Sequence, residues 1–559
     1  MTAGEPEVEK KEPITTDPSS DSQPSYDDVE AAHGTVEHIS PLKRSLQGRH
    51  MQMIAIGGAI GAGLFVGTGE ALYEGGPGSL LLGYLIVGGM LLLTIQALGE
   101  LAVLYPVNGA FFTYCVRFID PSWGFAVGWD YAIGWLIILP FEITAAGITI
   151  QFWRDDINIG VWVTVFLVAL SAIQIFGVRG YGEVEFVLSI IKVTALLGFI
   201  ILGIVIDCGG APKGSYIGTH YWFDPGAFTT FEGFCAVFTT AAFAFGGTEM
   251  TGLAAAEAAN PAKSIPKATK QVFWRITLFY VVGTFIVGLI VPANADYLLG
   301  SSGANTKASP FVVSIQNAGI KGLPSVMNAV ITISVISVAN SATFGSSRTI
   351  QALAANGMAP KFLAYVDNAG RPLYCILLQI AFGFLAFINE ASSTGDTIFT
   401  WLLALSGVSN FFIWGSVCFA HIRFRQAWKY HGHSVDELAY AAPFGEIGSW
   451  IGLSLNVLCL IAEFYVSIAP LNATDFFENY LSVPLILALY FCWKIYSANS
   501  KDPKINNRGW KILLNIEEID VMSHIRDGAL DVDLPPRKVY ATWGEWFKAA
   551  PMRMVRSLI

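Results

Sequence analysis

The sequence is poor in charged residues and has no regularly spaced cysteines, and each shortage excludes a class of protein. Only 14% of the 559 residues are charged while 53% are hydrophobic, a composition too apolar for a soluble protein of this size. The seven cysteines show no CxxC or Cys/His spacing, and several fall inside apolar runs. We therefore interpret them as packing residues, expect no metal site, and expect most of the chain to lie in a lipid bilayer.

Large apolar side chains are scarce in the first forty residues. This segment is rich in acidic residues, Pro, Ser and Thr, so it cannot bury enough surface to fold alone, and residues 1–45 are predicted to be a disordered acidic tail. It also lacks a basic start followed by an apolar stretch, so we expect no secretory signal. At the other end, 499–559 is mixed in charge and too short for an enzyme domain, and is predicted to be a second cytosolic tail.

Apolar runs of membrane length fill the middle of the chain. A helix needs about 20 apolar residues to cross a bilayer, and this criterion gives roughly twelve spans. They lie near 52–73, 79–104, 124–150, 160–178, 184–206, 231–255, 272–293, 324–347, 373–390, 397–420, 447–469 and 482–497. The sequence therefore predicts an all-α membrane protein with a twelve-helix domain over 46–498.

Basic residues alternate between loops and so indicate an orientation. One set of loops is rich in Lys and Arg, whereas the opposite loops hold only Arg154, Lys213, Lys307 and Lys321. Because basic loops stay in the cytosol, and an even number of spans puts both ends on one side, both termini are predicted to be cytosolic. An Asn-Ala-Thr triplet beginning at Asn472 then lies outside, which makes Asn472 a candidate for glycosylation.

The first span, QMIAIGGAIGAGLFVG over 52–67, has glycines at positions 57, 58, 61 and 63. Glycine inside a helix costs about 1 kcal/mol relative to alanine, so four of them favour an opening of the helix. Unwound backbone survives in a bilayer only where protein, water or a solute satisfies it. The span is predicted to be a broken helix at a solute site. The alternative is a small-residue packing face; a dinucleotide loop is discounted because its spacing is off by one residue.

A second glycine break lies in the sixth span, FCAVFTTAAFAFGGTEMTGLAAAEA, at Gly246 and Gly247. Transporters built from inverted repeats have broken helices in corresponding spans of their two halves. Five spans separate the two breaks, so we predict repeats over about 50–206 and 231–420, with extra helices over 447–497. Two matched breaks favour a binding site over simple packing.

The two breaks together suit a small zwitterion. Backbone N–H groups at Gly61, Ala62 and Gly63, at the positive end of a half-helix, would hold a carboxylate. Freed carbonyls of the second break would hold an ammonium group, at Phe243, Ala244 and Gly246. The rings of Phe243 and Phe245 would close over the side chain.

Three ionisable residues stand deep in apolar spans, where each costs at least a few kcal/mol unless paired or hydrated. Lys192 either loses its proton or replaces a metal cation in a coupling site, and its alternative is a structural cation paired with one of the glutamates. Glu249 would pair with the solute or carry a coupling proton. Glu142 is a coupling acid or, alternatively, a packing or gating acid. Ser337 and Ser341, one helical turn apart, are expected to hydrogen-bond Lys192 or to pack.

Four stretches carry a family resemblance: RHMQMIAIGGAIGAGLFVGTG, GELAVLYP, FAFGGTEMTGLAAAEAANPAKSIPKA and WLLALSGVSNFFIWGSVCFAHIRFR. They resemble the fungal amino acid permeases, the yeast amino acid transporter family within the amino acid–polyamine–organocation superfamily, and most of all its general permeases. The resemblance runs from about Leu42 to the end of the twelfth span. It implies a LeuT-type fold with a 5+5 inverted repeat, broken helices 1 and 6, and alternating access.

The resemblance also implies roles for individual residues. Gly61, Ala62 and Gly63 match the family's carboxylate site, and Phe243, Phe245, Gly246 and Glu249 match the surroundings of the amino group. Lys192 matches the lysine that stands in for sodium in proton-coupled relatives, Glu142 a third-span acid important for transport, and Ser406 a tenth-span position linked to selectivity. Trp414 is our candidate gate aromatic, with ordinary packing as the alternative.

The implied function is plasma-membrane import of L-amino acids with protons, in a broad range that favours neutral side chains. The alternatives are a basic amino acid permease, a transport-inactive amino acid sensor, and exchange without proton coupling. We expect no enzyme activity, no cofactor other than the coupling ion H⁺, and no nucleic-acid partner. Relatives are withdrawn from the surface by ubiquitination of N-terminal lysines, which makes Lys10 and Lys11 the candidates for contact with ubiquitin-ligase machinery.

Overall fold

The computed structural model describes residues 42, 45–295, 298, 309–390, 394–468, 472, 476–477, 480–500 and 510–526, of which 56–57, 389–390 and 394–405 are described by their backbone alone. All of them belong to the second of the two units into which the chain divides, Ser40–Ile559. The predicted ubiquitination sites Lys10 and Lys11 lie outside the described residues. Asn472 is described, and its side chain is exposed.

The described part of the chain is built from helices, with one isolated bridge and no strand. The short π- or 3-10-helical stretches carry η labels. In chain order the elements are α2 (Gly48–Gly57), η1 (Gly63–Gly67), α3 (Thr68–Leu104), α4 (Ala110–Phe118), α5 (Pro121–Ile150), α6 (Ile159–Gln174), α7 (Gly177–Asp207), η2 (Trp222–Gly226), α8 (Phe231–Phe245), α9 (Met250–Leu253), η3 (Ala254–Glu257), α10 (Pro261–Arg275), η4 (Ile276–Val282), α11 (Gly283–Ile290), α12 (Pro310–Asn317), α13 (Leu323–Ala355), η7 (Lys361–Ala364), α14 (Leu373–Gly383), η8 (Phe384–Glu390), α15 (Thr394–Tyr430), η9 (Val435–Glu437), α16 (Gly445–Ile468), α18 (Ser482–Asn499) and η10 (Ile516–Glu518).

Membrane-length helices dominate this set. Within the described residues, six continuous helical segments are long and apolar enough to cross a bilayer, by length and composition: Gly63–Leu104, Pro121–Ile150, Gly177–Asp207, Pro261–Ile290, Leu323–Ala355 and Gly445–Ile468. The helices Ile159–Gln174 and Leu373–Ile388 are apolar but shorter. The chain is thus an all-helical membrane protein, while the count of twelve spans stays a prediction.

Local sequence explains where several helices begin and bend. Asp120 caps α5, because its carboxylate accepts hydrogen bonds from the backbone N–H groups of Ser122 and Trp123 at 3.0 and 3.3 Å, and Pro121 occupies the first helical position. Inside α3, Gly76 has φ 82°, a left-handed conformation that favours glycine, and Pro77 follows it. This bend separates the end of the first predicted span from the second.

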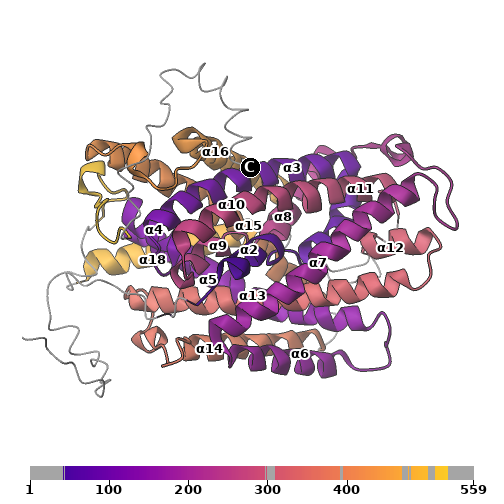
Figure 1. Cartoon of the computed structure of the whole chain (residues 1–559), viewed down its shortest axis with the longest axis horizontal. Coiled ribbons are helices and arrows are strands. Elements are labelled where there is room, and N and C mark those ends of the chain that lie inside the picture. The colour runs from indigo at the N-terminus through magenta and orange to yellow at the C-terminus, as the bar shows by residue number, and fades with distance from the viewer. Residues whose placement is uncertain are drawn as a thin grey trace, which may run out of the picture. The chain divides into compact units, whose positions relative to one another are not determined.

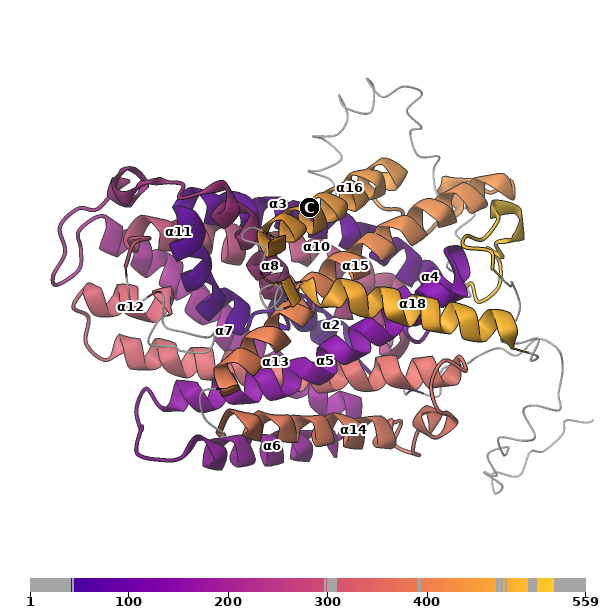
Figure 2. The ribbon, with the colours of Figure 1, turned by 180° about the vertical axis from the view of Figure 1, so that it is seen from behind.

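Two long helices, α5 and α13, lie side by side in the middle of the bundle (Figures 1 and 2) and make its most extensive helix–helix contact. The first half-helix, α2, packs against α7, whereas α8 packs against α3. The helices α15, α16 and α18 follow late in the chain, and α15 and α18 both contact α5. Segments far apart in the sequence therefore meet around α5 and α13.

Three further contacts join segments at the end of the bundle where α2 begins and α3 ends. Leu46 forms a parallel bridge with Ala258, and close by Arg348 pairs with Glu257 at 2.9 Å. The segment 510–526 also packs against this end, where Leu514 N–H donates to the Ile119 carbonyl at 2.9 Å. This part of the C-terminal region is thus bound to the helical body.

Candidate functional site

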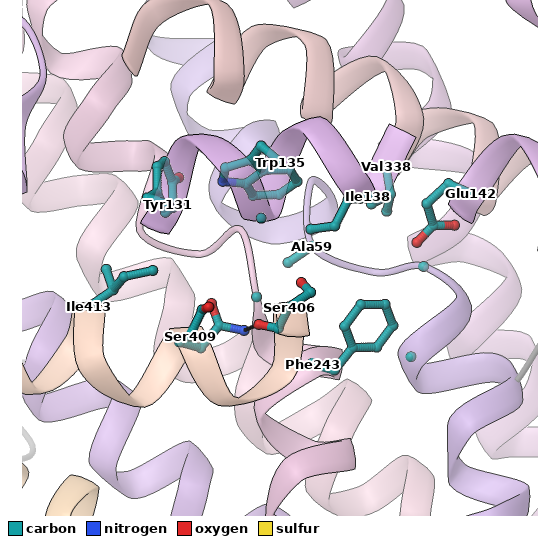
Figure 3. A pocket seen from close by; sticks show the side chains of 15 residues that line it. Ala59, Tyr131, Trp135, Ile138, Glu142, Phe243, Val338, Ser406, Ser409 and Ile413 are labelled. Carbon is teal, nitrogen blue, oxygen red and sulfur yellow. Dashed lines mark hydrogen bonds between the residues drawn. The ribbon is translucent and has the colours of Figure 1, made fainter. Parts of the chain in front are cut away.

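A small internal pocket lies where both helix interruptions meet α5, α13 and α15 (Figure 3). Helix α2 ends at Gly57 and helical structure resumes at Gly63, and α8 ends at Phe245 before α9 begins at Met250. The pocket encloses about 30 Å³ and is lined by Ala59, Gly61, Gly63, Tyr131, Gly134, Trp135, Ile138, Glu142, Phe243, Gly246, Val338, Ser406, Ser409, Asn410 and Ile413. It has room for water-sized groups, so a larger solute needs side chains to move.

The phenyl ring of Phe243 stands between this pocket and a second cavity. The second cavity is lined by Ala62, Gly63, Gly67, Glu70, Phe141, Thr239, Thr240 and Phe243. Gly63 and Phe243 line both, so the two spaces are neighbours. Phe243 is thus placed to control the size of the pocket.

The close approach of neighbouring residues explains why glycine occupies positions 61 and 63 of the first interruption. A Cβ atom at Gly63 would lie 2.7 Å from the Cα atom of Ala244, and one at Gly61 would lie 2.5 Å from Cγ2 of Val338. Both distances are shorter than a van der Waals contact. In the second interruption Gly247 has φ 92°, which glycine adopts without strain. The two broken segments therefore touch backbone to backbone.

Tyr280 joins the two interruptions. Its hydroxyl is 2.9 Å from the Ala244 carbonyl and 3.3 Å from the Ala59 carbonyl, and its ring stacks on Phe245 with centroids 4.3 Å apart. The side chain of Arg275 similarly donates to the Ala55 carbonyl at 2.8 Å. Side chains thus satisfy part of the backbone that the interruptions free, as a low-dielectric interior requires.

The pocket brings together six of the residues predicted from sequence: Gly61, Gly63, Glu142, Phe243, Gly246 and Ser406. Ala62 lines the neighbouring cavity. The other predicted residues lie outside the pocket lining: Ala244, Phe245, Lys192, Glu249 and Trp414. Of the residues predicted to handle the proton, Glu142 therefore lines the pocket, whereas Lys192 and Glu249 lie outside its lining.

Glu142 is the acidic side chain that faces the pocket. It is 1% exposed, and its Oε2 atom has no hydrogen-bond partner. Figure 3 shows the carboxylate near the first interruption, at the opposite end of the pocket from Tyr131. A buried, unsatisfied carboxylate costs free energy unless a proton or a cation neutralises it. Glu142 is therefore suited to binding a proton or an ammonium group.

Glu249 instead lies outside the pocket lining and accepts three hydrogen bonds. Its Oε1 atom accepts from the Tyr131 hydroxyl and the Gly247 backbone N–H, both at 3.1 Å, and its Oε2 atom accepts from Trp414 Nε1 at 3.2 Å. Tyr131 also lines the pocket. Glu249 thus stabilises the second interruption and contacts the pocket through the Tyr131 side chain.

Trp414 is fully buried and bonded to Glu249, so its replacement tests whether it acts as a support. We expect Trp414→Phe to lower the free energy of unfolding by about 1.5–3 kcal/mol, the contribution of a hydrogen bond to a charged group. Thermal unfolding of the purified variant measures this. Phe412→Leu, a partly buried position on the same helix, serves as a control, and an unchanged Trp414→Phe protein with altered substrate selectivity would support a gate instead.

Lys192 pairs with an acid that the sequence patterns did not single out. Its Nζ atom lies 3.4 Å from Oε1 of Glu185, and both side chains are 0% exposed. Ser337 lies between them, with its hydroxyl 2.8 Å from Lys192 Nζ and 2.7 Å from both carboxylate oxygens of Glu185. The predicted Ser337 contact is present, whereas the ion pair is with Glu185 and not with Glu142 or Glu249.

The sequence patterns missed Glu185 and several pocket residues of α5 and α15. Their spacing along the helices could have identified them. Glu185 precedes Lys192 by seven residues, which places both on one face of a helix two turns apart. Tyr131, Trp135, Ile138 and Glu142 share another such face, as do the pocket residues of α15, which are Ser406, Ser409, Asn410 and Ile413. A search for polar and aromatic residues at this spacing would have found these two faces of the pocket.

A bundle of membrane-length helices with an internal pocket beside a buried lysine and buried acids is typical of a membrane transporter. The chain belongs to the amino acid permease family, whose model matches residues 50–506.

Curated relatives match over most of their length. An uncharacterised amino-acid permease of Schizosaccharomyces pombe is 55% identical over 81% of this chain and 79% of its own. Cationic amino acid transporter 1 of the same organism is 49% identical over 92% and 90% of the two chains. General amino-acid permease GAP1 of Saccharomyces cerevisiae is 48% identical over 91% and 85%.

Proposed function

We propose that this protein imports L-amino acids across the plasma membrane together with protons, by alternating access of a LeuT-type 5+5 repeat with both termini in the cytosol. The observation that carries the proposal is the pocket itself. Interrupted backbone at Gly61, Gly63 and Gly246 lines the same buried space as the Glu142 carboxylate, whose Oε2 atom has no hydrogen-bond partner. Backbone dipoles at helix ends and one buried acid suit the two charged groups that every amino acid shares.

In this proposal the first interruption binds the carboxylate. The backbone around Gly61 to Gly63 starts the helical segment η1 and α3, so its N–H groups present the positive end of a helix. The ammonium group would lie toward Gly246 and Glu142. The side chain would extend past Phe243 toward Ser406, so the volume available there sets the size of the accepted residue.

The range of substrates is proposed to be broad, with a preference for neutral side chains. The pocket lining contains a single carboxylate, Glu142, and the ammonium group common to all substrates would occupy it. A cationic side chain needs a second acid to lie with it in the pocket. A basic amino acid permease is the second candidate, because Glu70 lines the adjoining cavity and one relative is named a cationic amino acid transporter.

In this proposal the buried side chain of Lys192 couples transport to the proton. Lys192 lies outside the pocket lining but donates to the Ile60 carbonyl at 3.4 Å, so it senses the state of the first interruption. The Lys192 ammonium group can replace a bound metal ion as the positive charge at this place, and unlike a metal ion it can release and rebind a proton. Regulation through Lys10 and Lys11 and a ubiquitin ligase also belongs to the proposal.

Uptake assays test the proposal. In cells that lack other permeases, one labelled neutral amino acid should enter and be displaced by an excess of most neutral amino acids, and less well by arginine and lysine. In substrate-free vesicles, an imposed pH gradient should drive accumulation. Displacement by basic amino acids alone would favour the second candidate. Absence of all uptake at full surface expression would favour a sensor, and exchange that ignores the pH gradient would contradict proton coupling.

A further inference from the structure

The buried ion pair of Lys192 and Glu185 has a function other than stabilising helix α7. Both side chains are 0% exposed, and their charged atoms are 3.4 Å apart. Removing two charges from water costs several kcal/mol per ion, so a buried pair is a poor way to gain stability, and apolar residues of similar volume often do better. A function that needs the charges accounts for their presence.

Ser337 connects the two charged groups. Its Oγ atom is within 2.8 Å of both the Lys192 ammonium and the Glu185 carboxylate. A hydroxyl group is at once a donor and an acceptor. It can therefore accept a proton from the ammonium group while it passes its own proton to the carboxylate, without any movement of heavy atoms.

The half-helix α2 contacts α7 at residues on either side of Glu185. Ser189 donates to Glu185 Oε1 at 3.2 Å and its hydroxyl lies 3.3 Å from the Met53 carbonyl on α2. One turn away on α7, a Cβ atom at Gly182 would lie 3.0 Å from Nδ1 of His50, so the two helices touch there. Because α2 ends at Gly57 and helical structure resumes only at Gly63, α2 is able to tilt as a unit, and a tilt would admit water to Glu185.

We propose that Glu185 is the group through which the coupling proton leaves for the cytosol, an inference that rests on the proton coupling and orientation proposed above. The Nζ–H bond of Lys192 breaks and an O–H bond forms on Ser337, while the original Ser337 O–H bond breaks and one forms on Glu185. The result is a neutral amine beside a neutral carboxylic acid, with no net change of charge. When α2 tilts, Glu185 releases its proton to water, and a proton from the outside restores the ammonium group.

Other ionisable groups lie near the pair. Glu142 on α5 and Arg275 on α10 interact electrostatically with Lys192, and Tyr181 on α7 interacts with Glu185. His50 on α2 lies against α7 near Gly182. Glu142 faces the pocket, so it is the group that would return a proton from the outside. Arg275 donates hydrogen bonds to the Ala55 carbonyl and to Thr248, so it stabilises the interruptions.

Glu185→Gln tests the inference in the full-length protein in vesicles. Accumulation driven by a pH gradient should fall about tenfold or more, because a positioned proton acceptor contributes at least that much. Exchange of internal for external amino acid at equal pH should stay near the parent rate, since it requires no proton release. Glu183→Gln is the matched control, because Glu183 lies two residues away, is 42% exposed, and pairs with Arg49 at the surface.

Several outcomes separate this inference from the wider proposal. If the parent protein shows no accumulation driven by a pH gradient, proton coupling itself is wrong. If the parent is coupled and Glu185→Gln accumulates equally well, or loses exchange and accumulation together, Glu185 does not release the proton. If Glu185→Gln does not fold, Ser337→Ala tests the proposal instead. This variant keeps both charged groups but removes the hydroxyl that connects them. We expect slower accumulation with a normal rate of exchange. Normal accumulation in Ser337→Ala would overturn the proposal.

Discussion

Gly61→Val is expected to reduce amino acid uptake by about 100-fold, the effect typical of misplacing a reacting or bound group by about 1 Å. A Cβ atom at this position would lie 2.5 Å from Cγ2 of Val338 and 3.4 Å from Oε1 of Glu142. Val338 cannot easily turn away, because a β-branched side chain in a helix has one preferred rotamer. The backbone that is proposed to bind the carboxylate must therefore shift.

The same substitution is expected to leave the protein folded and at the cell surface. Overpacking of this kind costs about 1–3 kcal/mol, which is less than the total stability of a typical protein. Gly61→Ala should have a smaller effect on uptake because it adds one atom. Gly198→Val is the control, since a Cβ atom there meets nothing within 4 Å. Undiminished substrate affinity in Gly61→Val would contradict the binding site.

Lys192→Met is expected to abolish accumulation driven by a pH gradient and to destabilise the protein. The substitution leaves Glu185 as a buried, unpaired charge, which costs about 3–5 kcal/mol. Thermal unfolding in detergent measures the loss, and uptake at several external pH values measures the coupling. If alkaline pH still suppresses the uptake of Lys192→Met as it does in the parent, the proposed role of the lysine is wrong.

The double variant Lys192→Met, Glu185→Gln separates the two effects. Replacing both members of a buried pair with neutral groups is often nearly neutral for stability, whereas breaking the pair is costly. We therefore expect the double variant to recover most of the lost thermal stability while it stays uncoupled. Recovery of coupling together with stability would mean that the pair serves the fold alone.

Local patterns predicted the helical membrane class and the positions where regular helix ends. The glycines at 57, 58, 61 and 63 predicted an opening, and no helix is assigned over 58–61. These features depend on neighbours in the sequence, because helix propensity and hydropathy act over a few turns. The number of spans and the repeat topology stay predictions.

The roles of Glu249 and Trp414 show what local patterns do not contain. Glu249, beside a break, was predicted to pair with the solute or to carry a coupling proton, and Trp414 was predicted to be a gate aromatic or an ordinary packing residue. In the fold Trp414 Nε1 donates to Glu249, 165 residues away in sequence, and both lie outside the pocket lining. How each helix is rotated about its axis decides this contact, and rotation follows from packing against other helices.

The sequence by itself determined that this is a helical membrane protein, to which family it belongs, and where its first span opens. Composition and hydropathy suffice for the class and glycine placement for the opening, because each reflects the solvent around a segment or the strain within it, whereas the family followed from the resemblance of four stretches. Only the tertiary structure decided that Lys192 pairs with Glu185 through Ser337, that Tyr280 joins the two interruptions, and that Glu142 faces the pocket with an unsatisfied oxygen. A buried charge requires a partner, but which partner it finds depends on the packing of helices distant in the chain.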